Sequence, residues 1–116
     1  MKRHHEPSAR RLRQRTAALR AAIAAMDYAS SGTLHSRTRA CGKANCRCAT
    51  DQDAWHGPYH DWTRRKDGRL VHNAVSPDQV RLIQRAITNR REIDRILARW
   101  EEETVAEILG PHRLSR

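Results

Sequence analysis

All three cysteines of this 116-residue chain lie within eight residues, in the stretch CGKANCRC, at Cys41, Cys46 and Cys48. Cys46 and Cys48 are two residues apart, so in an extended segment both side chains would point to the same side. Gly42 and Asn45 accept left-handed backbone angles, which would let the loop fold back and bring Cys41 into reach. Three converging thiolates are three of the four ligands that a structural zinc ion requires.

A histidine nitrogen is the expected fourth ligand. His56 is the first histidine after the cysteines, and it precedes Gly57-Pro58, which predicts a rigid turn. His60 and then His35 are the alternatives. The sequence therefore predicts a Zn²⁺ site whose ligands are Cys41, Cys46, Cys48 and His56.

Two other interpretations of the cysteines stay open. Reduced cysteines can pack as small hydrophobic side chains, and a Cys–His pair can be catalytic or redox-sensing. No Gly-rich phosphate loop, H-E-x-x-H helix or nucleophile elbow stands in the sequence, so we expect no enzymatic activity. Lys43 and Arg47 lie beside the cysteines and are expected to lower the pKa values of the thiols.

The net charge of +10 is concentrated at the front of the chain. Residues 1–50 hold eleven Lys or Arg against two acids, whereas residues 51–116 hold twelve against eleven. Such asymmetry predicts an anionic partner, most often a nucleic acid and here DNA first. The competing explanation is pairing of the N-terminal arginines with glutamates near the other end of the chain. The expected phosphate-binding residues of the middle segment are Arg37, Arg39, Lys43, Arg47, Arg64, Arg65 and Lys66.

Apolar spacing and turn signals predict the elements that position these residues. An amphipathic helix is expected from Ser8, a candidate N-cap, to about Tyr28. Residues 59–65 and 69–75 are expected to form a β-hairpin around Asp67-Gly68, with Trp62 facing Asn73. Ser76 and Pro77 predict the start of a long helix that continues to Leu109 and is stopped by Gly110-Pro111.

The fold class is therefore expected to be α+β, with the long helix packed antiparallel on the first. We expect a flexible basic tail over residues 1–7, one domain over 8–110 with the zinc loop and hairpin at 32–75, and a short tail over 111–116. No apolar run approaches the ~20 residues that cross a bilayer, and no secretory signal opens the chain. A cytoplasmic protein that does not enter membranes is expected, since thiols stay reduced in that compartment.

Four aromatic side chains have both a packing and a binding interpretation. Trp55 or Tyr59 is available to stack on a base, and Trp62 is the third ring of the same region. For each of these rings, packing of the hairpin against the helices is the alternative. Trp100, beside Ile96 and Leu97 on the long helix, would anchor a protein partner or close the core of the helical pair.

The residues from Thr33 onward resemble a known family. Leu34, Arg37 and Arg39, then CGKANCRC, then HGPYH, a glycine turn and a long helix opening with proline are similar to a small bacterial and archaeal domain of unknown function. Its signature is C-G-K-x-N-C-x-C followed by H-G-P-Y, and the resemblance covers Gly32 to Ile96. Two positions depart from the pattern: Ala44 replaces a common proline, and His60 replaces a common second aromatic residue.

The resemblance implies little about activity. Members are often encoded near transposase or recombinase genes, which implies an accessory role in a mobile element and a recombinase or transposase as a partner. Together the sequence predicts a zinc-stabilised, non-catalytic nucleic-acid-binding protein. The alternative is a helical-hairpin adaptor that docks on a partner protein or self-associates, with the cysteine loop as a brace.

Overall fold

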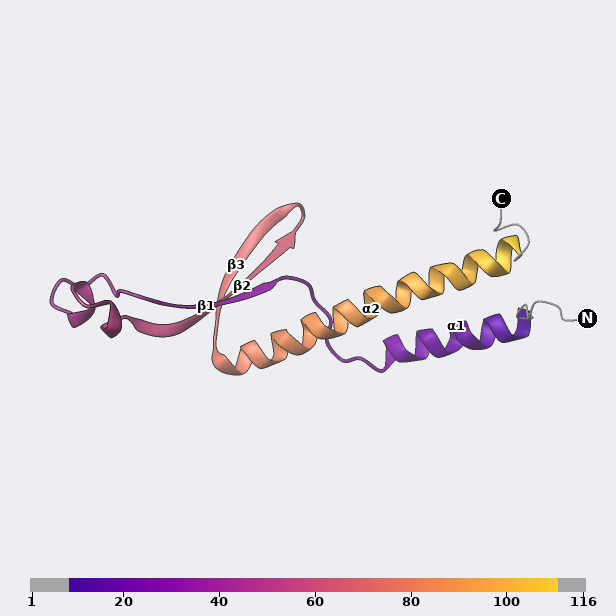
Figure 1. Cartoon of the computed structure of the whole chain (residues 1–116), viewed down its shortest axis with the longest axis horizontal. Helices are drawn as coiled ribbons and strands as arrows, with labels where there is room; N and C mark the ends of the chain where they lie inside the picture. The colour runs from indigo at the N-terminus through magenta and orange to yellow at the C-terminus, as the bar shows by residue number, and fades with distance from the viewer. Residues whose placement is uncertain (1–8, 111–116) are drawn as a thin grey trace, which may run out of the picture. The chain divides into compact units, whose positions relative to one another are not determined.

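The computed structural model describes residues 9–110 (Figure 1). Its strands lie between two helices along the chain, as expected of this α+β fold. They are α1 (Ala9–Ala24), β1 (Thr33–Arg39), the 3₁₀ turns η1 (Arg47–Ala49) and η2 (Gln52–Ala54), β2 (His56–Lys66), β3 (Arg69–Val75) and α2 (Pro77–Leu109). The fold class is confirmed. The tails at 1–7 and 111–116 and the Ser8 cap lie outside the described residues.

The described chain divides into two units, and α2 contributes to both. One unit runs from Tyr28 to Thr88 and holds the sheet and the cysteine loop. The other combines the residues up to Asp27 with those from Asn89 onward, so it consists of α1 and the C-terminal part of α2. The single domain expected over 8–110 stays a prediction.

The sheet has three antiparallel strands in the order β1-β2-β3, one strand more than the expected hairpin. The hairpin itself forms as predicted, because Asp67 and Gly68 both adopt positive φ, 53° and 79°, as a two-residue primed turn requires. Trp62 pairs with Asn73 in the expected register. β1 was not predicted, since Leu34 is its only strongly apolar residue; it forms by pairing with the edge of β2 that β3 leaves open.

The two helices pack antiparallel in their own unit, with Leu12 and Leu19 of α1 and Ile96 of α2 buried (Figure 1). Arg15 Nη1 lies 3.2 Å from Glu103 Oε2, which is the kind of arginine–glutamate pairing expected between the helix ends. No helix in the described range 9–110 is long and apolar enough to cross a membrane.

The ends of the helices follow from local hydrogen bonds. Ser76 and Gln79 form a reciprocal capping box at the start of α2, with Gln79 N–H donating to Ser76 Oγ and Ser76 N–H to Gln79 Oε1. Gly110, at φ 80°, ends α2. α1 ends at Ala24 rather than near Tyr28, because the chain leaves the helix to bond elsewhere: Ser30 N–H donates to Ala86 O at 3.1 Å.

The buried core is small in both units. Six apolar side chains of the described residues are buried, and the most completely buried is Cys48, at 1% exposure. A core of this size contributes little hydrophobic stability, so the fold depends on a few close contacts. One of these is at Gly32, where the backbone at φ 123° lies against the Trp62 indole.

We predict that Gly32→Ala destabilises the protein by more than about 1 kcal/mol. A Cβ at this position would lie 2.5 Å from Trp62 Nε1 and 2.6 Å from Thr63 O, in addition to the unfavourable φ. Urea unfolding measures the effect. The control is Gly68→Ala, where φ is also positive, at 79°, but no atom lies within 4 Å of the added Cβ, so this variant should lose less stability. Equal losses for the two variants would contradict the role given to the close contact.

Candidate metal centre

The loop between β1 and β2 folds into two short turns that carry the cysteines. A bond from Cys46 N–H to Lys43 O closes the first bend, and Ala49 N–H donates to Cys46 O to form η1. Cys48 therefore lies inside a 3₁₀ turn, and the expected extended Cys46–Cys48 segment is wrong. Gly42 has the expected positive φ of 88°, but Asn45 does not: among the described residues, Asp67 is the only non-glycine with positive φ.

Four ligand atoms meet at this loop. The sulfur atoms of Cys41, Cys46 and Cys48 and a ring nitrogen of His56 all lie within 4.8 Å of one another. Cys48 Sγ is 3.5 Å from Cys41 Sγ, and Cys46 Sγ is 3.2 Å from His56 Nε2. Cys41 N–H also donates to Cys48 Sγ at 3.3 Å. Cys48 is buried whereas Cys41 and His56 are exposed, so the cluster is open on one side.

His56 reaches the cluster because β2 begins at that residue, next to an irregularity in β1. The register of β1 against β2 shifts between Arg37 and Arg39, and His56 pairs with Arg39. Gly57, at φ 130°, permits this approach, since a Cβ there would lie 2.9 Å from Arg37 O and 3.2 Å from Thr38 Cα. In the HGPY motif, His56 thus supplies a candidate metal-ligand nitrogen, and Gly57 lets the backbone of β2 lie close to that of β1.

The two alternative histidines lie elsewhere on the sheet. His60 pairs with Ser36, and its Nδ1 is 2.7 Å from Ser36 Oγ. His35 pairs with Asp61 on the neighbouring strand. Within the described residues, the group of four includes His56 and neither of these two.

The thiols influence one another's pKa. The pKa of Cys46 is lowered, chiefly by the backbone N–H of Cys48 and then by the thiols of Cys48 and Cys41. The Cys41 amide also acts to lower the pKa of Cys48, but burial and the adjacent sulfur atoms outweigh it, so the pKa of Cys48 is raised. The Arg47 guanidinium pairs with the Asp51 carboxylate at 3.1 Å, and its expected effect on the thiols stays a prediction.

These donors fit one metal ion. Three sulfurs and an imidazole nitrogen are the ligand set of tetrahedral structural zinc sites. Thiolates this close together would repel one another, and a bound cation would offset that repulsion. The geometry is therefore consistent with a Cys₃His metal site; it does not by itself select the metal.

The chain matches the profile of one known family. The profile of a family described as a domain of unknown function, DUF6788, matches residues 9–85. The chain belongs to this family. The match spans α1, the cysteine loop, the whole sheet and the first turns of α2, so the cluster lies within the DUF6788 region. Neither the curated proteins nor the solved structures contain a match to the chain.

The seven predicted phosphate-binding residues of this DUF6788 protein do not form one patch. The cysteine loop and the Asp67-Gly68 turn lie at opposite ends of β2, roughly 30 Å apart at about 3.3 Å per residue. The cations of the cysteine loop therefore lie far from those of the hairpin tip.

Several of these cations already have partners. Arg37 pairs with Asp61 at 3.2 Å and Arg47 with Asp51, while the Arg39 guanidinium lies 4.5 Å from the centre of the Tyr59 ring. Arg64 lies 5.3 Å from the centre of the Trp62 ring. No ion pair forms in the described part of the chain with the remaining three, which are Lys43, Arg65 and Lys66.

The four aromatic candidates differ in exposure. Trp55 and Tyr59 are exposed, and Tyr59 already has Arg39 over its ring. Trp62 is half-buried, and its Nε1–H donates to Ser31 O at 3.2 Å. Trp100 is half-buried in the helical unit and lines an apolar groove with Leu97.

Sequence reasoning missed two contributors. Asp51 organises the loop: its carboxylate accepts from Asp53 N–H at 3.0 Å and pairs with Arg47. The D-Q-D spacing, typical of an aspartate that caps a short turn, was the signal available. Arg69 follows the hairpin turn directly opposite Lys66, and the sequence RKDGR shows this once the turn is recognised.

Removal of a ligand should abolish metal binding and lower stability. We predict that protein purified without added zinc carries about one metal ion per chain, and that Cys46→Ser and His56→Gln lose it and melt at a lower temperature. Elemental analysis and thermal unfolding measure these effects. His60→Gln is the matched control and should retain the metal, since its side chain bonds to Ser36. A Cys46→Ser protein that melts like the parent would show that the site is not structural.

Proposed function

We propose that this protein is a zinc-stabilised, non-catalytic nucleic-acid-binding protein that contacts phosphates through the tip of the β2–β3 hairpin. The observation that supports the proposal is the pair of like charges at the tip: Lys66 and Arg69 are direct cross-strand partners across the turn. Like charges in this arrangement destabilise a hairpin, and an anion bound between them would relieve the repulsion.

The surroundings of the tip support the same proposal. Arg65, Lys66 and Arg69 are exposed and have no ion pair in the described chain, and Asp67 is the only acid between them. Exposed arginine and lysine side chains bind the phosphate oxygens of nucleic acids most readily. The metal would act at the other end of β2, where it would fix the start of the strand.

The accessory role in a mobile element and the cytoplasmic location belong to the same proposal. The first rests on the gene neighbourhood that the family resemblance implies. The second rests on the three unpaired thiols, which require a reducing compartment to remain available to a metal.

Salt dependence tests the proposal. With three tip cations contacting phosphates, the slope of log affinity against log salt should be about −2.7 for duplex DNA and about −2.1 for a single strand. Lys66→Gln should make the slope shallower by about 0.9 or 0.7. Fluorescence anisotropy with labelled oligonucleotides between 50 and 200 mM salt, roughly the range in which such contacts are resolved, measures it.

The matched control is Lys43→Gln, which removes an exposed cation of the cysteine loop that makes no ion pair with the described residues. It should leave the slope unchanged. A parent protein that binds no oligonucleotide at the lowest salt would contradict the proposal, as would a tip variant that binds like the parent.

A second candidate function, self-association, is favoured by the outer side of α2. Leu97, Val105 and Ile108 are 41%, 43% and 73% exposed, and Leu97, Trp100 and Val105 line a groove of about 540 Å³. A second copy of the chain suits this groove because the charges of α2 are ordered. Residues 90–99 hold four arginines against two acids, whereas residues 101–107 hold four glutamates and no cation, so two antiparallel copies of α2 would bring segments of opposite net charge together.

Leu97→Gln should convert such a dimer to a monomer while the chain stays folded, because the side chain is exposed within one copy. Sedimentation velocity measures the mass, and circular dichroism checks the fold. Leu82→Gln, a leucine of similar exposure (44%) in the other part of α2, is the control and should leave the mass unchanged. A monomeric parent at high concentration would exclude this function.

A further inference from the structure

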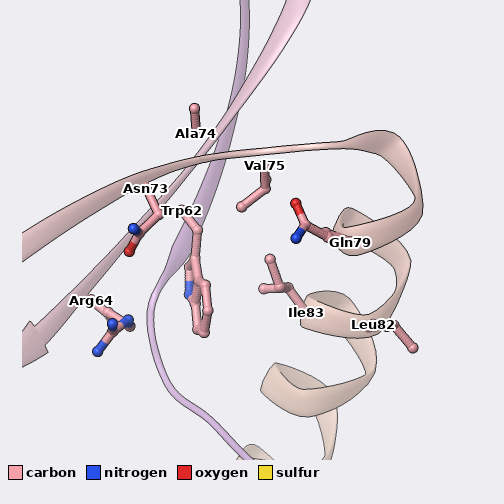
Figure 2. Close-up of a pocket in the computed structure, with 8 residues that line it drawn as sticks. All are labelled: Trp62, Arg64, Asn73, Ala74, Val75, Gln79, Leu82 and Ile83. Carbon is pink, nitrogen blue, oxygen red and sulfur yellow. The ribbon is translucent and has the colours of Figure 1, made fainter.

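A pocket of about 420 Å³ opens where the sheet meets the first turns of α2, all within the Tyr28–Thr88 unit (Figure 2). β2 contributes Trp62 and Arg64, β3 contributes Asn73 and Val75, and α2 contributes Ile83. In Figure 2 the Trp62 indole lies between the Arg64 side chain and Ile83, with Asn73 above Arg64. A pocket of this size with mainly apolar walls and a few polar groups is typical of a small-ligand site.

The Trp62 indole is held in a fixed orientation. Its Nε1–H donates to Ser31 O at 3.2 Å, and the Gly32 backbone lies against the same edge of the ring. The polar edge of the indole is thereby satisfied and immobilised. Val75 and Ile83 supply apolar contacts on the α2 side. The Arg64 guanidinium lies over the ring, 5.3 Å from its centre, so a planar ligand that stacks on the indole would take the place of that side chain.

Two polar side chains of the pocket have hydrogen-bonding groups that are unused in the described chain. Arg64 Nε is buried and makes no hydrogen bond. A buried donor left unpaired destabilises a protein, so an oxygen acceptor from a ligand would be bound favourably there. Asn73 lies directly opposite Trp62 in the sheet, and its side-chain amide makes no hydrogen bond in the described chain. An amide has both donors and an acceptor, which suits the edge of a nucleobase.

The pocket and the proposed phosphate contacts lie along the same strand, β2. Trp62 lies four residues before Lys66 on β2, or about 13 Å along the strand. Arg64 stands between them, so cations and the aromatic ring follow one another along the same ribbon. Lys66 and its cross-strand partner Arg69 lie on the same face of the sheet as Trp62 and Arg64, so a nucleic-acid strand whose phosphates contact these two residues would pass the mouth of the pocket.

We propose that this pocket binds one unstacked base of a single-stranded nucleic acid, with Trp62 as the stacking surface, Arg64 donating to an oxygen of the nucleotide and Asn73 contacting the edge of the base. The inference rests on the proposed function and names its substrate class. A duplex would have to release a base from its stack, which costs a few kcal/mol, whereas a single strand offers its bases directly. Single strands are therefore the preferred ligands.

The experiment compares three labelled probes of equal length: a single-stranded oligonucleotide, the same strand with abasic sites at its central positions, and a duplex. All three offer phosphates, but only the first offers accessible bases throughout. The parent should bind the intact strand about 5- to 150-fold more tightly than the abasic strand, the range of one stacked base. It should also prefer the intact strand to the duplex.

Two variants test the pocket itself. Asn73→Ala and Arg64→Lys should reduce the preference for the intact strand to less than about threefold, with the salt slope kept, since the tip cations remain. Arg64→Lys keeps the charge and loses the planar guanidinium with its Nε donor. Arg81→Lys is the matched control: it makes the same exchange at an exposed arginine of α2 that pairs with Asp78 and lies outside the pocket, and it should keep the preference. Circular dichroism verifies folding, and either folded variant is sufficient for the test.

The outcomes separate this inference from the function on which it rests. Equal binding of intact and abasic strands, with binding still lost in Lys66→Gln, overturns the base pocket and leaves the phosphate-binding tip in place. An intact-strand preference that survives both pocket variants also overturns it. Failure of the parent to bind any of the three probes removes the proposed function and the pocket together.

Discussion

Convergence of three sulfur atoms and one imidazole nitrogen at the end of the sheet is the contact on which the middle of this chain depends. Only six apolar side chains of the described residues are buried, and the most buried of them is one of the ligands, Cys48. The loop over residues 40–55 has sixteen residues and contains only two short 3₁₀ turns. Few other contacts are therefore available to stabilise its conformation. Crowding of the thiols disfavours their joint ionisation, and a divalent cation reverses that preference.

β2 connects this site to the rest of the sheet. The strand begins at His56, a predicted ligand, continues through Trp62 and ends at Lys66 beside the turn. Because β2 is the central strand, with β1 on one side and β3 on the other, fixing its first residue also constrains both pairings. The candidate metal centre and the candidate ligand surfaces are thus separate in space but share one structural element. This arrangement suits a metal that braces the fold without contacting the ligand.

The turn chemistry and the helix signals were predictable because they depend on neighbouring residues. Asp67-Gly68 specified the hairpin and its register, and Ser76-Pro77 specified the start of α2. The third strand was missed because β1 is mostly polar and forms only by pairing with β2. The extended Cys46–Cys48 segment was wrong because backbone bonds from Ala49 and Thr50 close a 3₁₀ turn there, a preference that the spacing of two residues does not reveal.

Residue types and spacing by themselves determined the three candidate cysteine ligands, the order of the two helices and the hairpin, and the excess of positive charge. Each of these follows from side-chain chemistry or from interactions over a few residues. Tertiary structure decided which histidine joins the cysteines, because the shifted register between Arg37 and Arg39 brings His56 to the loop, while pairing with Ser36 keeps His60 away. It also decided that the loop cations and the tip cations lie at opposite ends of one strand. Both outcomes depend on strand length and register, which are set by pairing between segments distant in the sequence.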